Sequence, residues 1–560
     1  TASNNTAVGY EALHVNTTGD QNVAIGAYAL DACTTGSNIV AIGAYALSSS
    51  TSSGNNIAIG RRAAFSTTTA GDIIAIGYQA LHDNTTGAHN IALGRNALYN
   101  NTTAAYNIAI GRDALEANET GAQNIAIGYD ALTTATGVNY SLAIGLNSQK
   151  NNQSGDSNVS LGWQTMKDLT TGDSNTAVGN EAMEKTTTGV QNTALGRTAL
   201  YNNTTGGNNT AIGQSALKAN TTASNNTAVG RTALFANTTG TSNTAVGYQA
   251  LNANTTNSHN TAVGYNALLN NDAQYNTACG KEAVQANTSG SRLVGVGNRA
   301  LYSNTTGNHN HAFGDHALFA CTTASANTAV GYESATAITT GHSNVAVGYQ
   351  ALHDATTSIR CVTIGYMAGG NITDGGDNIC IGYQSGMYNT SLTTGDDNVF
   401  IGSYVEAGDA NAIKSIAIGY NAVGKGSNTG MMKASSGMYQ SNNSSTWSTT
   451  SDIRIKKNVV DNNTGLDKIN QIQVRNFEYR TEEEITDFDN PRSAVVEKQG
   501  LQVGVIAQEI KTILPDVVEE LSTGVLTVNP DNLTWYLVNA VKELSTENNA
   551  LKARLDAAGL

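Results

Sequence analysis

A repeat with a period of 17 fills most of the chain and limits what the chain can fold into. Glycines that close an Ala-(Val/Ile/Leu)-Gly triplet recur at this constant spacing from Gly9 through Gly26 and Gly43 to Gly264. After one spacing of 16 and one insertion of three residues, the frame ends at Gly419 and gives 25 units. One unit cannot bury its apolar face alone, whereas stacked units form a continuous core. The repeat therefore predicts a solenoid.

The pattern inside each unit predicts one strand and one turn. The residues three and one before the glycine are branched or apolar, as are Ile57 and Ile59 before Gly60. This period of two indicates a strand, and the small residue between them suits a crowded face. In the Asn-Thr-Thr-Gly segment that follows, Asn and Gly tolerate positive φ, and Asn and Thr side chains can bond nearby backbone. At about 4.8 Å between stacked strands, the coils would extend for about 120 Å.

The repeat resembles the head repeats of trimeric autotransporter adhesins and the arrays of bacteriophage tail fibres over about residues 1–420. The resemblance implies a parallel β-roll assembled as a homotrimer. We expect a mainly β fold with a repetitive parallel β-roll or β-solenoid shaft in residues 1–422 and an irregular neck in 423–450. A small α+β domain is expected in 451–560.

Composition changes near residue 450. Residues 451–560 contain 30 of the 72 charged residues and all three prolines. The net charge of −14 argues against nucleic acid as a partner, because phosphate binding needs a basic face. No apolar run approaches the roughly 20 residues that span a bilayer, so we expect no membrane insertion. Because the chain begins at Thr1 within a repeat unit, we expect a missing upstream region that joins other virion tail proteins.

The stretch Ser451-Asp452-Ile453-Arg454-Ile455-Lys456-Lys457-Asn458, followed later by Gln508-Glu509, resembles the intramolecular-chaperone autoprocessing domain. That domain ends phage endosialidases, tail spikes and neck appendages, and it also occurs in the myelin regulatory factor family. The resemblance implies a domain that trimerises, helps the upstream β-structure fold and then cuts itself off. It gives catalytic roles to Ser451 and Lys456 and supporting roles to Arg454, Asn458, Gln508 and Glu509.

The resemblance places the scissile bond between Ser451 and Asp452. A lysine amine activates a serine only if burial or nearby positive charge favours its neutral form. Attack by Ser451 on its own carbonyl would need a strained four-membered ring. The open alternatives are attack on the Thr450 carbonyl and attack by a water that Lys456 activates. Either reaction would make the chain a single-turnover, self-cleaving serine peptidase with no activity on other proteins and no cofactor.

The terminal domain is expected to mix short strands and helices. The predicted strands are Ile453–Val460, Val474–Tyr479, Leu501–Ile506 and Val525–Val528. The predicted helices are Leu466–Ile472, Ala507–Leu514 and 531–558, and residues 481–492 are predicted to form a loop.

The last helix has a coiled-coil pattern. Its seam positions, spaced alternately four and three residues apart, are Leu537, Val541, Leu544, Asn548, Leu551 and Leu555. A buried Asn548 could fix register and oligomer state. The alternative is a helix that packs on its own domain.

Cysteine and histidine give no clear metal signal. The five cysteines are scattered without ligand spacing, so isolated free thiols are expected. His309 and His311 are weak metal candidates, because a trimer would bring copies of both together. We predict no metal.

The leading hypothesis is a trimeric tail fibre of a phage virion that binds a host cell-surface receptor, either a glycan or an outer-surface protein. The alternatives built on the same β-roll are a bacterial cell-surface adhesin and a solenoid that binds ice or glycans.

Overall fold

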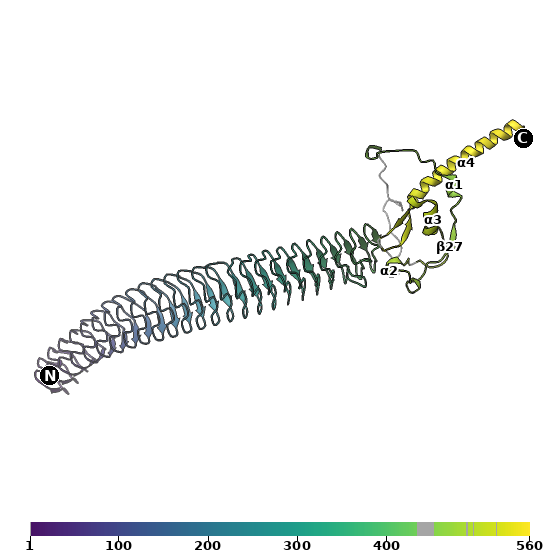
Figure 1. Cartoon of the computed structure of the whole chain (residues 1–560). Coiled ribbons are helices and arrows are strands. Elements are labelled where there is room, and N and C mark those ends of the chain that lie inside the picture. Colours follow the sequence, from purple (N-terminus) through teal and green to yellow (C-terminus); the bar gives the residue numbers. More distant parts are fainter. Residues whose placement is uncertain (1, 434–452, 489–490, 497, 522, 560) are drawn as a thin grey trace. The chain divides into compact units, whose positions relative to one another are not determined.

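The computed structural model describes residues 2–433, 453–488, 491–496, 498–521 and 523–559. The chain divides into two compact units, Thr1–Asp315 and His316–Leu560. Both contain stacked coils of a parallel β-solenoid, and the second also contains short sheets and a terminal helix (Figure 1). The predicted fold class, a β-solenoid of about 25 coils followed by a small α+β region, is confirmed.

In the first unit, three-residue strands of successive coils pair in parallel. Ile57 of β4 lies opposite Ile74 of β5, which is the equivalent residue of the next repeat. Where the spacing is 16, Thr261 pairs with Thr277, so the missing residue is taken from a turn and the ladder stays intact. The strands are β1 (Thr6–Val8), β2 (Val23–Ile25), β3 (Val40–Ile42), β4 (Ile57–Ile59), β5 (Ile74–Ile76), β6 (Ile91–Leu93), β7 (Ile108–Ile110), β8 (Ile125–Ile127), β9 (Leu142–Ile144), β10 (Val159–Leu161), β11 (Thr176–Val178), β12 (Thr193–Leu195), β13 (Thr210–Ile212), β14 (Thr227–Val229), β15 (Thr244–Val246), β16 (Thr261–Val263), β17 (Thr277–Cys279), β18 (Val294–Val296) and β19 (His311–Phe313).

The solenoid strands of the second unit pair in the same way. The three-residue insertion places Ile379 opposite Val399 and again leaves the pairing continuous. The ladder extends past the predicted shaft boundary at residue 422, because β26 pairs with β25. These strands are β20 (Thr328–Val330), β21 (Val345–Val347), β22 (Val362–Ile364), β23 (Ile379–Ile381), β24 (Val399–Ile401), β25 (Ile416–Ile418) and β26 (Gly430–Met432).

Strands β2 to β25 turn their middle residue inward, where it is buried, and their two flanking residues outward. Ala58 is fully buried, whereas Ile57 and Ile59 are half-buried. The core is completed by the Ala-Leu pair that follows the strand, such as Ala80 and Leu81, both fully buried. Small alanine side chains let the walls of a coil approach closely. The larger aliphatic side chains therefore lie on the outer face of the strand ladder.

Left-handed backbone occurs just before and just after the strands, as at Ser174 and Gly179 on either side of β11, and not within the Asn-Thr-Thr-Gly turn where it was expected. Gly179 has a φ of 134°, and a Cβ there would lie 2.7 Å from the carbonyl of Gly196. Glu181 and Met183 have φ values of 56° and 54°, a region that costs a non-glycine residue about 1–2 kcal/mol. Neither Asn203 nor Gly206 of the next turn has positive φ, so that prediction was wrong. The side-chain part was right, because the Asn203 amide donates to the Gly206 carbonyl at 3.0 Å.

Buried asparagines form a second ladder inside the coils. The Asn192 side chain donates to the Asn175 side-chain oxygen at 3.1 Å and to the Gly206 carbonyl at 2.9 Å. Its own oxygen accepts a hydrogen bond from the Asn209 backbone N–H at 3.0 Å. Asn192 is almost completely buried, so these bonds satisfy groups that water cannot reach.

The Asn192→Ala variant should therefore weaken the coils around it. We expect a loss of about 2–4 kcal/mol in local opening free energy, because the backbone N–H of Asn209 and the carbonyl of Gly206 lose buried partners. Native-state hydrogen exchange at Asn209 measures this loss. The control is Asn180→Ala, which removes an exposed amide. Equal protection in both variants would show that the asparagine ladder does not stabilise the stack.

The terminal region of the second unit contains small helices and two two-stranded antiparallel sheets. β27 pairs with β28 and β29 pairs with β30. The elements are η1 (Ile453–Ile455), α1 (Leu466–Ile469), β27 (Arg475–Phe477), η2 (Glu482–Glu484), α2 (Pro491–Ala494), β28 (Gln502–Gly504), α3 (Ala507–Ile513), η3 (Pro515–Val517), β29 (Val518–Glu520), β30 (Leu526–Val528) and α4 (Pro530–Ala558).

Most predicted elements of this region are present; α4 has its predicted length, whereas the other helices and the strands are shorter than expected. The strand predicted for Ile453–Val460 is wrong, because that segment begins with the single turn η1 and Asn458 has a φ of 54°. The loop predicted for 481–492 contains η2 and the start of α2, and β29 was not predicted. No helix of the described residues is long and apolar enough to cross a membrane.

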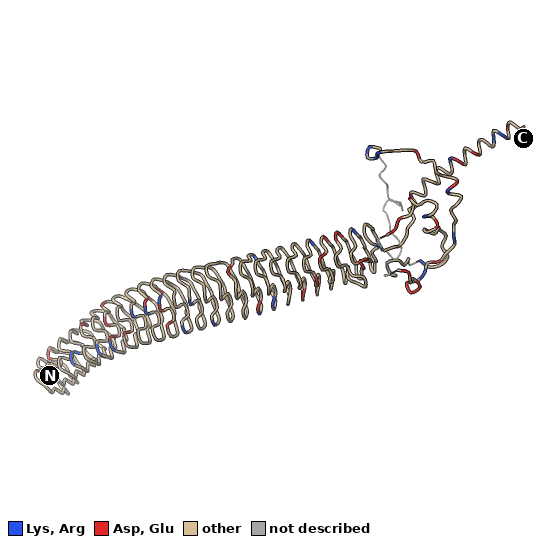
Figure 2. Tube along the Cα trace, viewed as in Figure 1, with Lys and Arg blue, Asp and Glu red and all other residues tan. Residues whose placement is uncertain are grey.

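Charged residues are distributed as the sequence composition indicated. Lys and Arg are interspersed with Asp and Glu, sparsely along the coils and more densely in the terminal region (Figure 2).

All five cysteines are free, as predicted, and only Cys279 is exposed. Burial raises the pKa of the Cys321 thiol to about 12 and that of Cys361 to about 11. These thiols are core residues and not nucleophiles.

Candidate functional site

The segment that carries the predicted catalytic residues is exposed where the structure describes it. Ser451 and Asp452 lie outside the described residues. Arg454 lies in η1 and is exposed, and the backbone N–H of Lys456 donates to the Ile453 carbonyl at 3.1 Å. The Lys456 side chain is exposed as well. The single chain therefore provides neighbouring positive charge for this lysine but little burial, and a catalytic lysine uses one or both.

A small core holds the terminal region together. Its buried members are Ile510, Leu514, Val517 and Tyr536. Ile469 of α1 and Val528 of β30 pack against them. The first half of α4 is therefore packed against α3, and α1 and β30 contribute to the same core.

The second half of α4 has no comparable cover within the described chain. The buried residues of the whole helix are Tyr536 and Ala540, and both lie in its first half. The seam residues are all exposed, at 45% for Leu537, 65% for Val541, 54% for Leu544, 53% for Leu551 and 42% for Leu555, and Asn548 is exposed too. The predicted helix is confirmed, and only its first half packs on its own domain.

Local residues define the start and the end of α4. The Asn529 side chain accepts hydrogen bonds from the backbone N–H groups of Asp531 and Asn532, and Pro530 occupies the first turn. Gly559 ends the helix in the left-handed conformation. The helix is therefore defined locally at both ends and needs no partner to set its length.

Gln508 and Glu509 belong to the start of α3. Glu509 pairs with Arg475 of β27 at 2.9 Å, and both side chains are partly exposed. Gln508 is exposed. In the described chain, the ion pair of Glu509 joins α3 to β27 and does not reach the segment around Lys456. A role for these two residues in cleavage stays a prediction.

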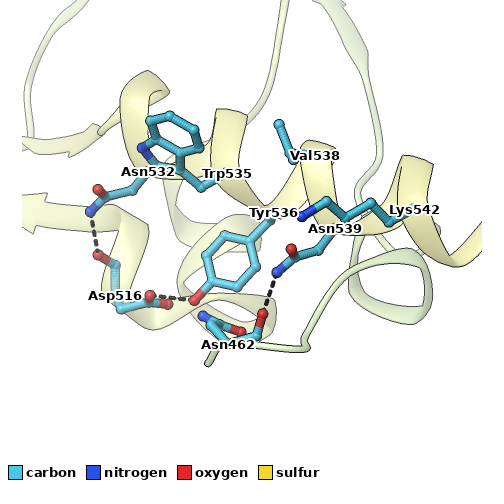
Figure 3. A pocket seen from close by; sticks show the side chains of 8 residues that line it. All are labelled: Asn462, Asp516, Asn532, Trp535, Tyr536, Val538, Asn539 and Lys542. Carbon is cyan, nitrogen blue, oxygen red and sulfur yellow. Dashed lines mark hydrogen bonds between the residues drawn. The ribbon is translucent and has the colours of Figure 1, made fainter. Parts of the chain in front are cut away.

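A hollow of about 430 Å³ lies beside the first half of α4 (Figure 3). The Tyr536 hydroxyl donates to the Asp516 carboxylate, and this bond raises the pKa of Tyr536. Trp535 is 67% exposed at the rim. The lining residues are Asn462, Asp516, Asn532, Trp535, Tyr536, Val538, Asn539 and Lys542. Sequence reasoning did not find this hollow, because its residues are not contiguous and form no motif.

Two side chains of α4 hold the segment that follows the predicted catalytic residues. The Asn539 amide donates to the Asn462 carbonyl at 2.6 Å (Figure 3). It also donates to the Thr464 carbonyl at 3.2 Å. The Glu543 carboxylate accepts a hydrogen bond from the Leu466 backbone N–H at 2.6 Å. These bonds join residues that are 75 to 77 positions apart in the sequence. They connect the segment 462–466, which we call the motif segment because it follows the motif residues 451–458, to the terminal helix.

The histidine candidates do not form a site in one chain. His309 has left-handed backbone with a φ of 56°, and His311 is an exposed residue of β19. Among the described residues, no group of three or more His, Cys, Asp or Glu side chains could hold a metal ion.

Comparison with known proteins supports the assignment of the terminal domain. Residues 451–519 match the family described as "Chaperone of endosialidase". Over 106 residues, 19% of this chain, the sequence is 28% identical to "Myelin regulatory factor homolog 1" of Caenorhabditis elegans. The chain spans about a tenth of that protein's length, since the match covers 11% of it. These matches and the solenoid fit a fibre that carries an intramolecular chaperone.

Proposed function

We propose that this chain is the subunit of a trimeric tail fibre, whose terminal domain first assembles three copies and then removes itself by cleavage near Ser451 and Asp452. The exposed seam of α4 carries this proposal. It presents five apolar residues between 42% and 65% exposed on a helix whose ends are already capped. Such a stripe is covered when copies of the helix form a coiled coil. The family match at 451–519 supports the chaperone role.

The outer face of the strand ladder supports the same stoichiometry for the shaft. Aliphatic residues at the strand ends are exposed, at 45% for Leu161 and 47% for Leu195. Other strands of the ladder also end in exposed or half-buried aliphatic residues, beside a buried middle residue. Exposed apolar residues that gather on one face mark a protein–protein interaction surface, and parallel packing of three shafts would cover it.

The chemistry proposed for cleavage uses Ser451 and Lys456. Lys456 takes a proton from the attacking hydroxyl and returns it to the leaving amine. If Ser451 attacks, the Thr450–Ser451 amide becomes an ester that water then hydrolyses. If an activated water attacks, the Ser451–Asp452 amide breaks directly. Either route consumes one water and leaves one carboxylate and one amine. Burial of Lys456 by neighbouring copies would favour its neutral form, so cleavage follows assembly.

Folding physics explains why a shaft of this kind needs a helper. Parallel β pairing between coils and chains is non-local, which makes folding slow and exposes strand edges to aggregation. A coiled coil that forms first brings three chains together in register. Once the helper is cut off, the assembled shaft is held by its slow unfolding.

The proposed location is the virion, with other tail proteins and a host-surface receptor as partners. A cell-surface adhesin is the alternative, and the neighbouring coding sequences would distinguish the two. An ice- or glycan-binding array is less favoured, because threonine hydroxyls of the turns bond within the stack. Thr187 and Thr204, for example, each donate to the carbonyl 17 residues further on, at 3.2 and 3.0 Å.

Charges placed on the seam test the assembly step. In the double variant Val541→Glu and Leu544→Glu, trimer association should weaken at least a hundredfold, because each unpaired charge buried in a coiled coil costs about 3–5 kcal/mol. Cleavage should stop together with association. The control variant Thr546→Glu and Asn549→Glu adds the same charge to exposed positions away from the seam. Light scattering gives the mass, and a seam variant that remains trimeric would refute the proposal.

A further inference from the structure

The hydrogen bonds of Asn539 and Glu543 hold the backbone of a distant segment in a defined position. They fix the carbonyls of Asn462 and Thr464 and the N–H of Leu466, so they hold backbone atoms and not side chains. Backbone atoms at three points of one short stretch set both the position and the direction of the chain. The Leu466 N–H is also one of the orphan donors at the start of α1, which Glu543 satisfies.

Close packing reinforces this contact. A Cβ on Gly465 would lie 2.6 Å from the Ala540 backbone nitrogen, so only glycine allows the segment to approach the helix this closely. Ala540 is buried, with 4% of its surface exposed. Asn539, Ala540 and Glu543 thus form one small contact surface on α4, which we call the clasp.

The clasp and the seam lie on different sides of the same helix. A helix turns by about 100° per residue. Around the helix axis, Asn539 and Glu543 therefore lie to one side of Ala540, and Val541 and Leu544 lie to the other side. Partner helices could therefore cover the seam and leave the clasp in place. The same rigid helix would then contact its partners with one face and hold the motif segment with another.

We propose that Asn539 and Glu543 are positioning residues for self-cleavage, which pass the orientation of the assembled α4 to the motif segment. This inference rests on the proposed function. Lys456 lies only six residues before Asn462. Fixing the chain at Asn462 restricts where the Lys456 amine can be, and misplacement of a reacting group by about 1 Å can cost a hundredfold in rate. The clasp residues would act through the backbone that they hold.

The reaction rate of three variants tests the clasp. Asn539→Ala and Glu543→Ala should each slow cleavage at least tenfold. Glu543→Gln should cleave at close to the wild-type rate, because its amide oxygen still accepts the hydrogen bond of Leu466. Cleavage is followed in pulse-labelled full-length chains on denaturing gels. The matched control is Glu547→Ala, one turn along the helix at an exposed position.

A structural role is separated from a positioning role by repeating Asn539→Ala and Glu543→Ala in the uncut Ser451→Ala background. The proposal expects the trimer mass and the thermal midpoint to stay at the parent values. It is overturned if these variants cleave at the wild-type rate, if they lose the trimer, or if Glu543→Gln is as slow as Glu543→Ala. If the wild-type chain itself is never cut, the proposed function fails and not the clasp alone.

Discussion

The Ser451→Ala chain should run as one full-length band on a denaturing gel, whereas the wild-type chain should give two fragments. On the route in which Ser451 attacks, removing the hydroxyl eliminates the nucleophile, and loss of a catalytic serine lowers rates by at least about 10⁴-fold. Lys456→Ala and Lys456→Arg should also stay uncut, since a guanidinium keeps its proton and cannot serve as the base. The expected loss is thus complete on any practical timescale.

The neighbouring lysine provides the control for this prediction. Lys457→Ala removes one positive charge beside the motif and should still be cut. The first residue of the released fragment, determined by mass spectrometry, separates the two routes, because hydroxyl attack releases a fragment that starts at Ser451 and water attack one that starts at Asp452. Cleavage of Ser451→Ala at the wild-type rate would refute the serine role, and a wild-type chain that stays whole would refute self-cleavage.

A chain that ends at Thr450 should give at least about tenfold fewer soluble trimeric shafts than the full chain, because non-local strand pairing without prior assembly favours aggregation. The shaft has few charges to oppose association, since residues 1–450 contain only 42 of the 72 charged residues. Size-exclusion chromatography of the soluble fraction, followed by a melting curve from circular dichroism, measures the yield of heat-resistant shafts.

Full-length Ser451→Ala is the control for this truncation, because it keeps the helper but cannot release it. It should give as many soluble trimers as wild type. The helper role is refuted if the chain that ends at Thr450 yields heat-resistant shafts in the wild-type amount. The solenoid fold itself would be unaffected by that result, because its strand ladder is formed by pairing between its own coils.

The strand ladder could be predicted because the constant repeat length fixes which residues of successive coils pair. A glycine at the same place in every repeat sets Ile57 opposite Ile74, and the structure pairs these residues. The left-handed backbone at Glu181 and Met183 could not be predicted, because such residues are unfavourable in isolation. They are stabilised only when the same conformation recurs in the neighbouring coils, and local propensity does not include this effect.

The terminal site was predictable in its residues but not in its geometry. Periodicity alone located α4 and its seam. The segment after Ser451 was expected to be a strand because of its apolar alternation, yet no neighbouring strand pairs with it in the described chain. Asn539 and Glu543 escaped notice, since single polar residues on a helix are ordinarily solvated. Their function depends on backbone atoms of Asn462 and Leu466, which are distant in the sequence and adjacent only in the folded chain.

The mass of the uncut chain tests the central claim most directly. In sedimentation equilibrium of full-length Ser451→Ala, the account predicts a single species of about three times the 58.0 kDa subunit mass. A species of one or two subunit masses at micromolar concentration would contradict it, because neither the seam of α4 nor the aliphatic face of the shaft would then be joining three copies.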